Sequence, residues 1–259
     1  MAVKSLIFGG AAAILFTAPV LAADMLPPPP VMDPGPPGVV EIGTGWYLRG
    51  DVGYVDYHKP RVDEVVLANT VYATDKLDKT WSAGGGFGYK FTSWFRADVT
   101  ADYRFDAAFR GTGTAPGFTS TESAQLNSTS VLLNGYLDLG NWGGVTPYVG
   151  AGIGYAQNSL GEYTSVRTCL DAFCGTGLAL YAPGNVVRAP RESHATHNLA
   201  WALMGGVAVD AGGGFKLDLG YRYVNLGDAE TELNATRGRT RAKDLESHEV
   251  RLGVRYMID

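Results

Sequence analysis

Apolar and polar residues alternate with a period of two in eight segments of the chain. The clearest segment reads FRADVTADYR, where every second residue is apolar and the residues between carry a charge or a hydroxyl. A strand with this period turns one face toward an apolar medium and the other toward a polar one. The eight predicted strands cover residues 46–56, 81–90, 95–104, 126–139, 148–157, 197–210, 215–223 and 247–258.

The connections between these strands alternate in length. Three are short, at residues 91–93, 140–147 and 211–214, and four are long, at residues 57–80, 105–125, 158–196 and 224–246. Bacterial outer-membrane barrels have short periplasmic turns and long extracellular loops, and an even strand number closes the sheet without a free edge. The pattern therefore predicts an all-β fold: an eight-stranded antiparallel transmembrane β-barrel of up-and-down topology, with short periplasmic turns and long extracellular loops.

Aromatic residues gather near both ends of the predicted strands. Trp46, Trp94 and Tyr256 lie near short turns or chain ends, whereas Trp81 and Tyr155 lie beside long connections. Trp and Tyr favour the headgroup level of a membrane because one end of each ring is apolar and the other binds water. The alternative is a soluble barrel with an aromatic core, which would place the charged residues outside rather than in the lumen.

The first 45 residues carry signals of export. Lys4 precedes an uncharged apolar stretch at residues 6–16, and Ala22 ends a suitable cleavage site, so residues 1–22 are expected to be a signal peptide. The apolar stretch is shorter than the ~20 residues that a spanning helix needs. Residues 23–45 contain seven prolines and form a predicted Pro-rich periplasmic leader, either a tether or a plain disordered linker. Residues 46–259 are the predicted barrel domain.

Charge and cysteine content narrow the class further. The formal net charge is −5, and a nucleic-acid partner would require a basic patch, so no nucleic acid is expected as a partner. The two cysteines, Cys169 and Cys174, lie close together in the third long connection. In an exported chain such a pair usually forms a local disulfide, which we expect here.

Several segments carry a family resemblance. They are LAAD followed by prolines, GWYLRGDVGY, NGYLDLG, TPYVGAGIGYA, FKLDLGYRYVNLGDAE and HEVRLGVRYMID. Together they resemble the small porin-family outer-membrane immunogenic proteins, or surface antigens, of alpha-proteobacteria, within the OmpA-like and OmpX-like group of eight-stranded barrels. The resemblance covers essentially the whole mature chain and implies the outer membrane of a Gram-negative bacterium. It also implies outer-membrane lipid, lipopolysaccharide, the barrel assembly machinery and host surface molecules as partners.

No motif for catalysis or cofactor binding stands out. The chain lacks metal-ligand spacing of Cys and His, a phosphate-binding loop and a nucleophile elbow, so no enzymatic activity, metal or cofactor is expected. Imidazole can ligate haem iron, so a surface haem site is an alternative to solvated loop histidines. The histidines at the loop ends of strands are His58, His194, His197 and His248.

The inward faces of the predicted strands carry charges of both signs in nearly equal number. Eight strands leave a lumen only wide enough for side chains to fill, and isolated buried charges would be costly. These groups are therefore expected to form a salt-bridge network that plugs the barrel. Glycines at positions 84, 86, 88, 150, 152 and 154 either make room for long arginine side chains or leave a water-filled gap. The predicted lumen charge network consists of Arg49, Asp51, Arg96, Asp98, Asp102, Arg104, Asp138, Lys216, Asp218, Arg222, Glu249, Arg251 and Arg255.

These features favour a structural, surface-exposed outer-membrane protein that contributes to envelope integrity and to contact with a host or the environment. A narrow porin-like channel for small solutes is the first alternative, and surface binding of haem or another ligand is the second. Conductance in a planar bilayer distinguishes the scaffold from the channel. Haem titration of the protein with its histidines replaced tests the surface binding of haem.

Overall fold

The computed structural model describes residues 45–59, 61–64, 71–115, 117–170, 182–190, 193–230 and 240–258. The predicted signal peptide and nearly all of the Pro-rich leader lie outside the described residues. Cys174 lies outside them as well, so its disulfide with Cys169 stays a prediction. The described residues contain thirteen β-strands. No helix among them is long and apolar enough to span a membrane.

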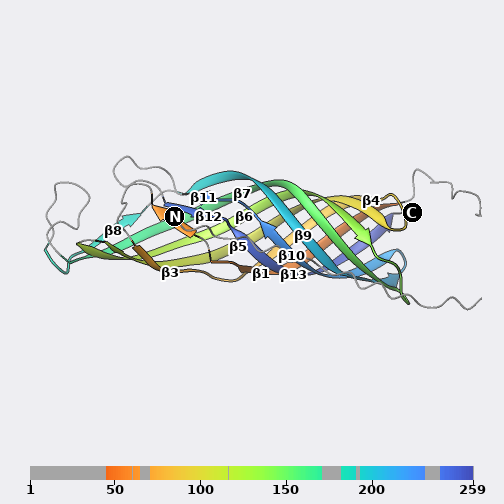
Figure 1. Ribbon diagram of the computed structural model, residues 1–259, viewed down its shortest axis with the longest axis horizontal. Coiled ribbons are helices and arrows are strands. Elements are labelled where there is room, and N and C mark those ends of the chain that lie inside the picture. The colour runs from red at the N-terminus through yellow and green to blue at the C-terminus, as the bar shows by residue number, and fades with distance from the viewer. Residues whose placement is uncertain are drawn as a thin grey trace, which may run out of the picture. The chain divides into compact units, whose positions relative to one another are not determined.

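Eight of these strands form a closed antiparallel ring (Figure 1). Each strand pairs with both of its neighbours, and β1 closes the ring by pairing with β4 on one side and β13 on the other. The predicted eight-stranded, up-and-down antiparallel barrel is therefore confirmed. In ring order the strands are β1 (Trp46–Tyr57), β4 (Thr80–Lys90), β5 (Phe95–Ala115), β6 (Phe118–Asp138), β7 (Val145–Cys169), β9 (His194–Gly212), β10 (Phe215–Asn225) and β13 (Glu246–Ile258).

Five shorter strands lie on the side of the long connections, and two of them add to the barrel wall. β3 (Val71–Leu77) pairs with β5 beyond the end of β4, and β8 (Val186–Pro190) pairs with β7. A separate small sheet contains β2 (Arg61–Glu64), β12 (Thr240–Lys243) and β11 (Ala229–Glu230). In the chain, β2 follows β1, β11 follows β10, and β12 precedes β13.

The long connections contain more strand than the sequence pattern predicts. The prediction that residues 105–125 form a loop is wrong, because β5 continues to Ala115 and β6 begins at Phe118. β7 likewise reaches Cys169, well into the connection predicted at residues 158–196. We call residues 107–115, 118–126 and 160–169 of these three strands the extension.

The outer face of the ring changes character along the strands. Toward the short turns it is covered by large exposed apolar side chains, a surface suited to lipid. In the extension most outward side chains are polar, with Thr112, Thr121 and Thr168 all exposed. This change explains why the sequence pattern predicts these strands to end too early, since the alternating apolar residues of a lipid-facing strand stop there. The apolar band includes Leu48, Val52, Phe87, Val131, Leu133, Val149, Ile153, Leu203, Leu217, Leu219, Val250, Leu252 and Val254.

Candidate functional site

The inner face of the barrel carries a dense set of buried charged side chains. Arg104 and Glu249 are 0% exposed, and Arg96 and Asp102 are 1% exposed. The structure places every residue of the predicted lumen charge network on the inner face, on β1, β5, β6, β10 and β13. Buried charges require close partners, because an isolated buried ion loses its hydration without compensation.

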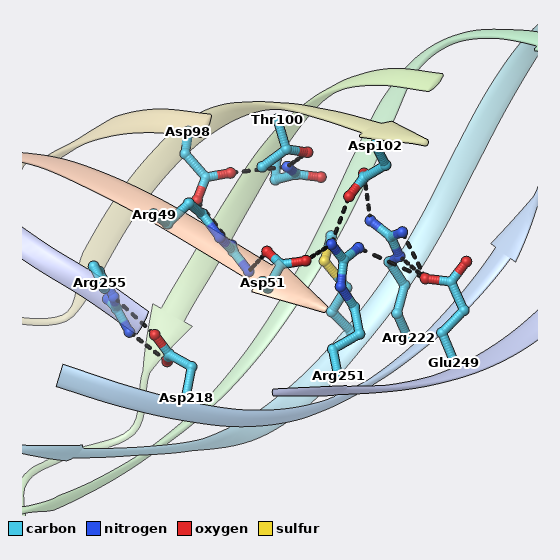
Figure 2. Close-up of polar contacts among 12 residues, drawn as sticks. Arg49, Asp51, Asp98, Thr100, Asp102, Asp218, Arg222, Glu249, Arg251 and Arg255 are labelled. Atoms are coloured by element: carbon cyan, nitrogen blue, oxygen red, sulfur yellow. Dashed lines mark hydrogen bonds and ion pairs between the residues drawn. The ribbon is translucent and has the colours of Figure 1, made fainter. Parts of the chain in front are cut away.

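Figure 2 shows ion pairs that reach across the lumen between β1, β5 and β13. Arg49 lies 3.1 Å from Asp98 through Nη1 and 3.2 Å from Asp51 through Nη2. Arg251 on β13 contacts both Asp51 and Asp102, with a distance of 2.5 Å from its Nη2 to the Asp102 carboxylate. The walls of the barrel are thus joined by side chains as well as by the backbone sheet.

A second set of contacts continues from Asp102 toward the long connections. Arg222 on β10 lies 2.8 Å from Asp102 and 2.5 Å from Oε2 of Glu249. Oε1 of Glu249 accepts a hydrogen bond from Nε of Arg104 at 2.7 Å. Arg104 also donates through Nη1 to the Ser130 hydroxyl at 3.0 Å. Contacts at this level therefore link β5, β6, β10 and β13.

The pairs become separate toward the short turns. Arg255 donates two hydrogen bonds to Asp218, at 2.6 and 3.2 Å. Arg96 donates through Nε to Asp138 at 3.1 Å, and its guanidinium lies 3.9 Å from the ring centroid of Tyr136. No described ion pair joins either of them to the central charges, although Tyr136 contacts Arg96 through its ring and accepts a hydrogen bond from Arg49 at 2.8 Å.

Lys216 stands apart from the other predicted network residues. Its ammonium group lies 3.4 Å from the Asp210 carboxylate on β9, and the Asp210 side chain is 50% exposed. The structure does not bring Lys216 together with the central arginines and carboxylates. Lys216 therefore belongs to the mouth of the barrel rather than to the interior pairs.

Inward glycines leave space that larger neighbours fill. A methyl group at Gly84 would collide with the Asp102 carboxylate and would also meet the Arg251 guanidinium. At Gly150 a methyl group would meet the Tyr136 ring at 2.6 Å. Of the two roles open for these glycines, the contacts support making room for large polar side chains.

Uncharged side chains complete the pairing, and the sequence pattern alone does not single them out. The Tyr47 hydroxyl donates to Asp98 at 3.0 Å. The Asn134 amide donates to Asp98 at 2.8 Å and to the Thr100 hydroxyl at 3.0 Å. Their inward position follows from the period of two, but their partners depend on the strand register, which one sequence does not specify.

The lumen becomes apolar toward the long connections. Buried apolar side chains from six ring strands and their continuations meet there in one cluster. The sequence gives little sign of it, because most of these residues fall in segments predicted as loops. We call this cluster the apolar plug; it includes Val55, Tyr57, Phe109, Leu126, Leu160, Leu226 and Leu245, each at most 7% exposed.

Two cavities differ greatly in size within the described part of the lumen. One of about 20 Å³ lies among the ion pairs and is lined by Arg49, Asp51 and Arg251 among others. This is close to the ~10–15 Å³ that a single water molecule needs. The other, of about 440 Å³, lies at the short-turn end. The lumen therefore narrows from a wide mouth to the dimensions of a single water molecule.

The described histidines do not form a shared site. His197 contacts the Tyr155 hydroxyl on the outer face of β7 and β9. His248 lies 2.5 Å from the Tyr221 hydroxyl on the outer face of β10 and β13. Within the described ranges, no group of three His, Cys, Asp or Glu side chains is arranged to hold a metal ion.

Comparisons with known proteins show what the chain is similar to. The chain matches the model of the outer membrane protein β-barrel domain over residues 9–257. An uncharacterized protein of Brucella suis biovar 1 (strain 1330) is 29% identical over 280 residues, covering 91% of each chain. A protein of Rickettsia bellii (strain RML369-C) with the printed name "Putative adhesin" is 28% identical, covering 82% of this chain and 88% of its own. The crystal structure of Neisserial surface protein A covers 83% of this chain and 98% of its own, with a TM-score of 0.48 and 16% identity.

The family match places the barrel in a membrane and assigns its two ends to the two sides of that membrane. The apolar band on the outer face contacts lipid, the short turns lie in the periplasm, and the long connections lie outside the cell. The chain belongs to the outer membrane protein β-barrel domain family and resides in the outer membrane of a Gram-negative bacterium.

Proposed function

We propose that this protein is a closed, non-conducting scaffold that stabilises the envelope and presents its extension for contact with a host or the environment. The observation that carries the proposal is the filling of the barrel interior at two levels. Ion pairs occupy the level of the apolar band, and the apolar plug occupies the level above it. Catalysis and cofactor binding form no part of this function.

The two interior levels support a closed barrel for different reasons. Passage through the ion pairs would require separation of buried partners such as Arg222 and Glu249, and breaking a buried pair costs about 3–5 kcal/mol. Passage through the apolar plug would remove the hydration shell of a solute without polar compensation. A conducting path would need continuous water, whereas a cavity of about 20 Å³ lies at the ion pairs.

The extension supports a role in surface contact. Its outer face presents exposed hydroxyl groups from adjacent strands, with Thr112 directly opposite Thr121 and Thr119 directly opposite Thr168. Paired strands hold these side chains in fixed positions, and a preorganised surface loses less conformational entropy on binding than a mobile loop. The printed name of the Rickettsia bellii relative points in the same direction, and we extend it to this chain as part of the proposal.

Adherence of a non-adherent Gram-negative laboratory strain tests the contact role. Expression of the full-length protein should raise adherence to cultured mammalian cells. Replacing residues 107–126 with an Asn-Gly turn should remove most of that gain, because two of the three segments of the extension are then lost.

Two controls make this experiment specific. A shift between heated and unheated samples on detergent gels shows that the shortened barrel still folds. Gly143→Asn, in a periplasmic turn where φ is +62° and no atom lies within 4 Å of an added Cβ, should keep full adherence. Equal adherence of the full-length and shortened proteins would contradict the contact role.

A further inference from the structure

The periplasmic end of the lumen holds a cavity that the proposed function does not use. Its volume of about 440 Å³ lies within the ~300–1,000 Å³ range of small-molecule sites. Among its lining residues are Lys90, Lys216, Arg255, Asp138, Ser93 and Trp94. Aromatic surface and convergent polar groups in one concave site are typical features of ligand binding.

Strand register places like charges side by side at this cavity. Lys216 on β10 is directly opposite Arg255 on β13, and Lys90 on β4 is directly opposite Arg96 on β5. Arg255 has a second cationic neighbour across the sheet, Arg49 on β1. Like charges directly opposite one another destabilise a sheet, so this end of the barrel has positive charge to be neutralised.

Internal carboxylates neutralise the two arginines of these pairs. Arg96 lies 3.1 Å from Asp138, and Arg255 lies 2.6 Å from Asp218. Arg255 uses Nε and Nη2 for Asp218. Its Nη1 has no hydrogen-bond partner within the described residues, so one donor of this buried guanidinium stays available.

The two lysines are neutralised less completely. Lys216 lies 3.4 Å from Asp210, whose side chain is 50% exposed to solvent. Lys90 is partly buried and forms no described ion pair, and the carboxylate that acts on it electrostatically, Asp138, is already paired with Arg96. The cavity therefore has two ammonium groups and one guanidinium nitrogen with capacity for an anion.

We propose that this cavity binds a phosphate group, carried either by a phospholipid headgroup or by a soluble periplasmic phosphate ester. Lys216 and Arg255 each have a carboxylate partner, Asp210 and Asp218, and Asp138 is paired with Arg96, so Lys90 leaves one uncompensated positive charge at the cavity. A phosphate group supplies negative charge on several oxygens that can accept hydrogen bonds from more than one of these cations. A monoester carries about −1.5 to −2 charges at neutral pH, and the diester of a phospholipid headgroup carries a single negative charge.

The position of the cavity suits both sources of phosphate. Trp94 in its lining and Trp142 in the neighbouring turn are 57% and 67% exposed. Exposed tryptophans mark the headgroup level of a bilayer. The cavity therefore lies beside the phosphates of the inner leaflet while its mouth faces the periplasm.

The test uses the refolded protein in a maltoside detergent, which contains no phosphate. Glycerol 3-phosphate is titrated by calorimetry, and phosphatidylglycerol added to the micelles is followed by native mass spectrometry. The test variant is Lys90→Gln with Lys216→Gln. The control is Lys79→Gln, which removes a lysine on the extracellular side that pairs with Asp56 at 2.9 Å.

We expect wild type and Lys79→Gln to bind at least one probe, and the double variant to bind it at least tenfold more weakly. Binding of glycerol 3-phosphate supports a soluble ester, whereas binding of phosphatidylglycerol alone supports a lipid headgroup. Binding of neither probe, or binding that the double variant leaves unchanged, would overturn the site. If the double variant does not fold, Lys90→Gln alone serves, because that substitution breaks no described ion pair, and an affinity within twofold of wild type would then contradict the site.

Discussion

The apolar band and the extension have outer faces of opposite polarity on the same strands. Within the band, β6 turns Leu133 outward and buries Asn134 in the lumen. In the extension, β6 turns Thr121 outward and buries Leu126. The outer face thus takes the polarity of the medium that it meets, lipid at one level and water at the other, and at these positions of β6 the inner face has the opposite character.

This inversion shows that one barrel wall can be stabilised in two ways. At the level of the band, the interior depends on charges that compensate one another, so the loss of one partner is the main vulnerability. Where the extension joins the ring, the interior depends on the apolar plug, whose burial from water contributes about 25 cal/mol per Å² of buried area, while Glu122, Ser165 and Arg167 are buried further along the extension. Variants at matched positions of the two levels should therefore fail for different reasons and by different amounts.

Removal of a buried carboxylate should have the largest effect. Glu249→Ala leaves Arg104 and Arg222 without their shared partner, and we expect the free energy of unfolding to fall by about 3–5 kcal/mol. Urea unfolding of the protein in lipid vesicles measures this loss. Asp56→Ala is the control, because its 51% exposed side chain pairs with Lys79 at the surface and should cost at most about 1 kcal/mol. Similar losses for both variants would contradict a charge-dependent interior.

Truncation in the apolar plug should have the next largest effect. Leu126 is 2% exposed on the inner face of the extension. Leu126→Ala should lower the free energy of unfolding by about 2–5 kcal/mol, through lost burial and the cavity left behind. Gln125→Ala, one residue away on the exposed face, should change it by less than about 0.5 kcal/mol. A loss below about 1 kcal/mol for Leu126→Ala would mean that the plug does not stabilise the extension.

A cation introduced on the outer face should destabilise the protein at the level of the apolar band but not in the extension. Leu133→Arg places a charge on the lipid-facing side of β6 and should cost about 2–4 kcal/mol near the middle of the bilayer. Thr121→Arg places the same charge on the same strand in water and should change stability by less than about 0.5 kcal/mol. Folding efficiency into lipid vesicles, followed by gel shift, measures both. Equal losses would show that the extension is not outside the lipid.

Substitution of an inward glycine should have the smallest of these effects. Gly84→Ala forces a methyl group against Asp102 and Arg251, and overpacking of this kind costs about 1–3 kcal/mol. Gly50→Ala is the matched change on the lipid face of β1, where the nearest atom to an added Cβ is the Gly84 carbonyl oxygen at 3.9 Å. Urea unfolding should show a loss for Gly84→Ala alone. A lumen with a water-filled gap at Gly84 would tolerate both substitutions equally.

The barrel could be predicted from the sequence because lipid and lumen impose a strong contrast between alternate residues. Residues 95–104 show that contrast in every pair of positions. Residues 107–115 do not, since threonine and glycine alternate there with few large apolar side chains. The extension was therefore missed, although threonine favours strands as a β-branched residue.

The candidate site could be predicted only in part. The inward residues follow from the period of two, which also places Lys90 on the same face as Gly84 and Gly88. The pairing does not follow, because Arg251 on β13 reaches Asp102 on β5 and Lys216 contacts Asp210 on β9. Such contacts depend on strand register and side-chain reach in three dimensions, which one sequence does not encode in a readable pattern.

Single-channel recording of the refolded wild-type protein in planar bilayers tests the closed lumen most directly. Asp98 accepts hydrogen bonds from Tyr47, Arg49 and Asn134, so Asp98→Ala serves as a variant with loosened ion pairs. We expect wild type to remain silent and Asp98→Ala to show brief openings or lower stability. A steady, large conductance of the wild-type protein would contradict the closed scaffold and identify the barrel as a channel.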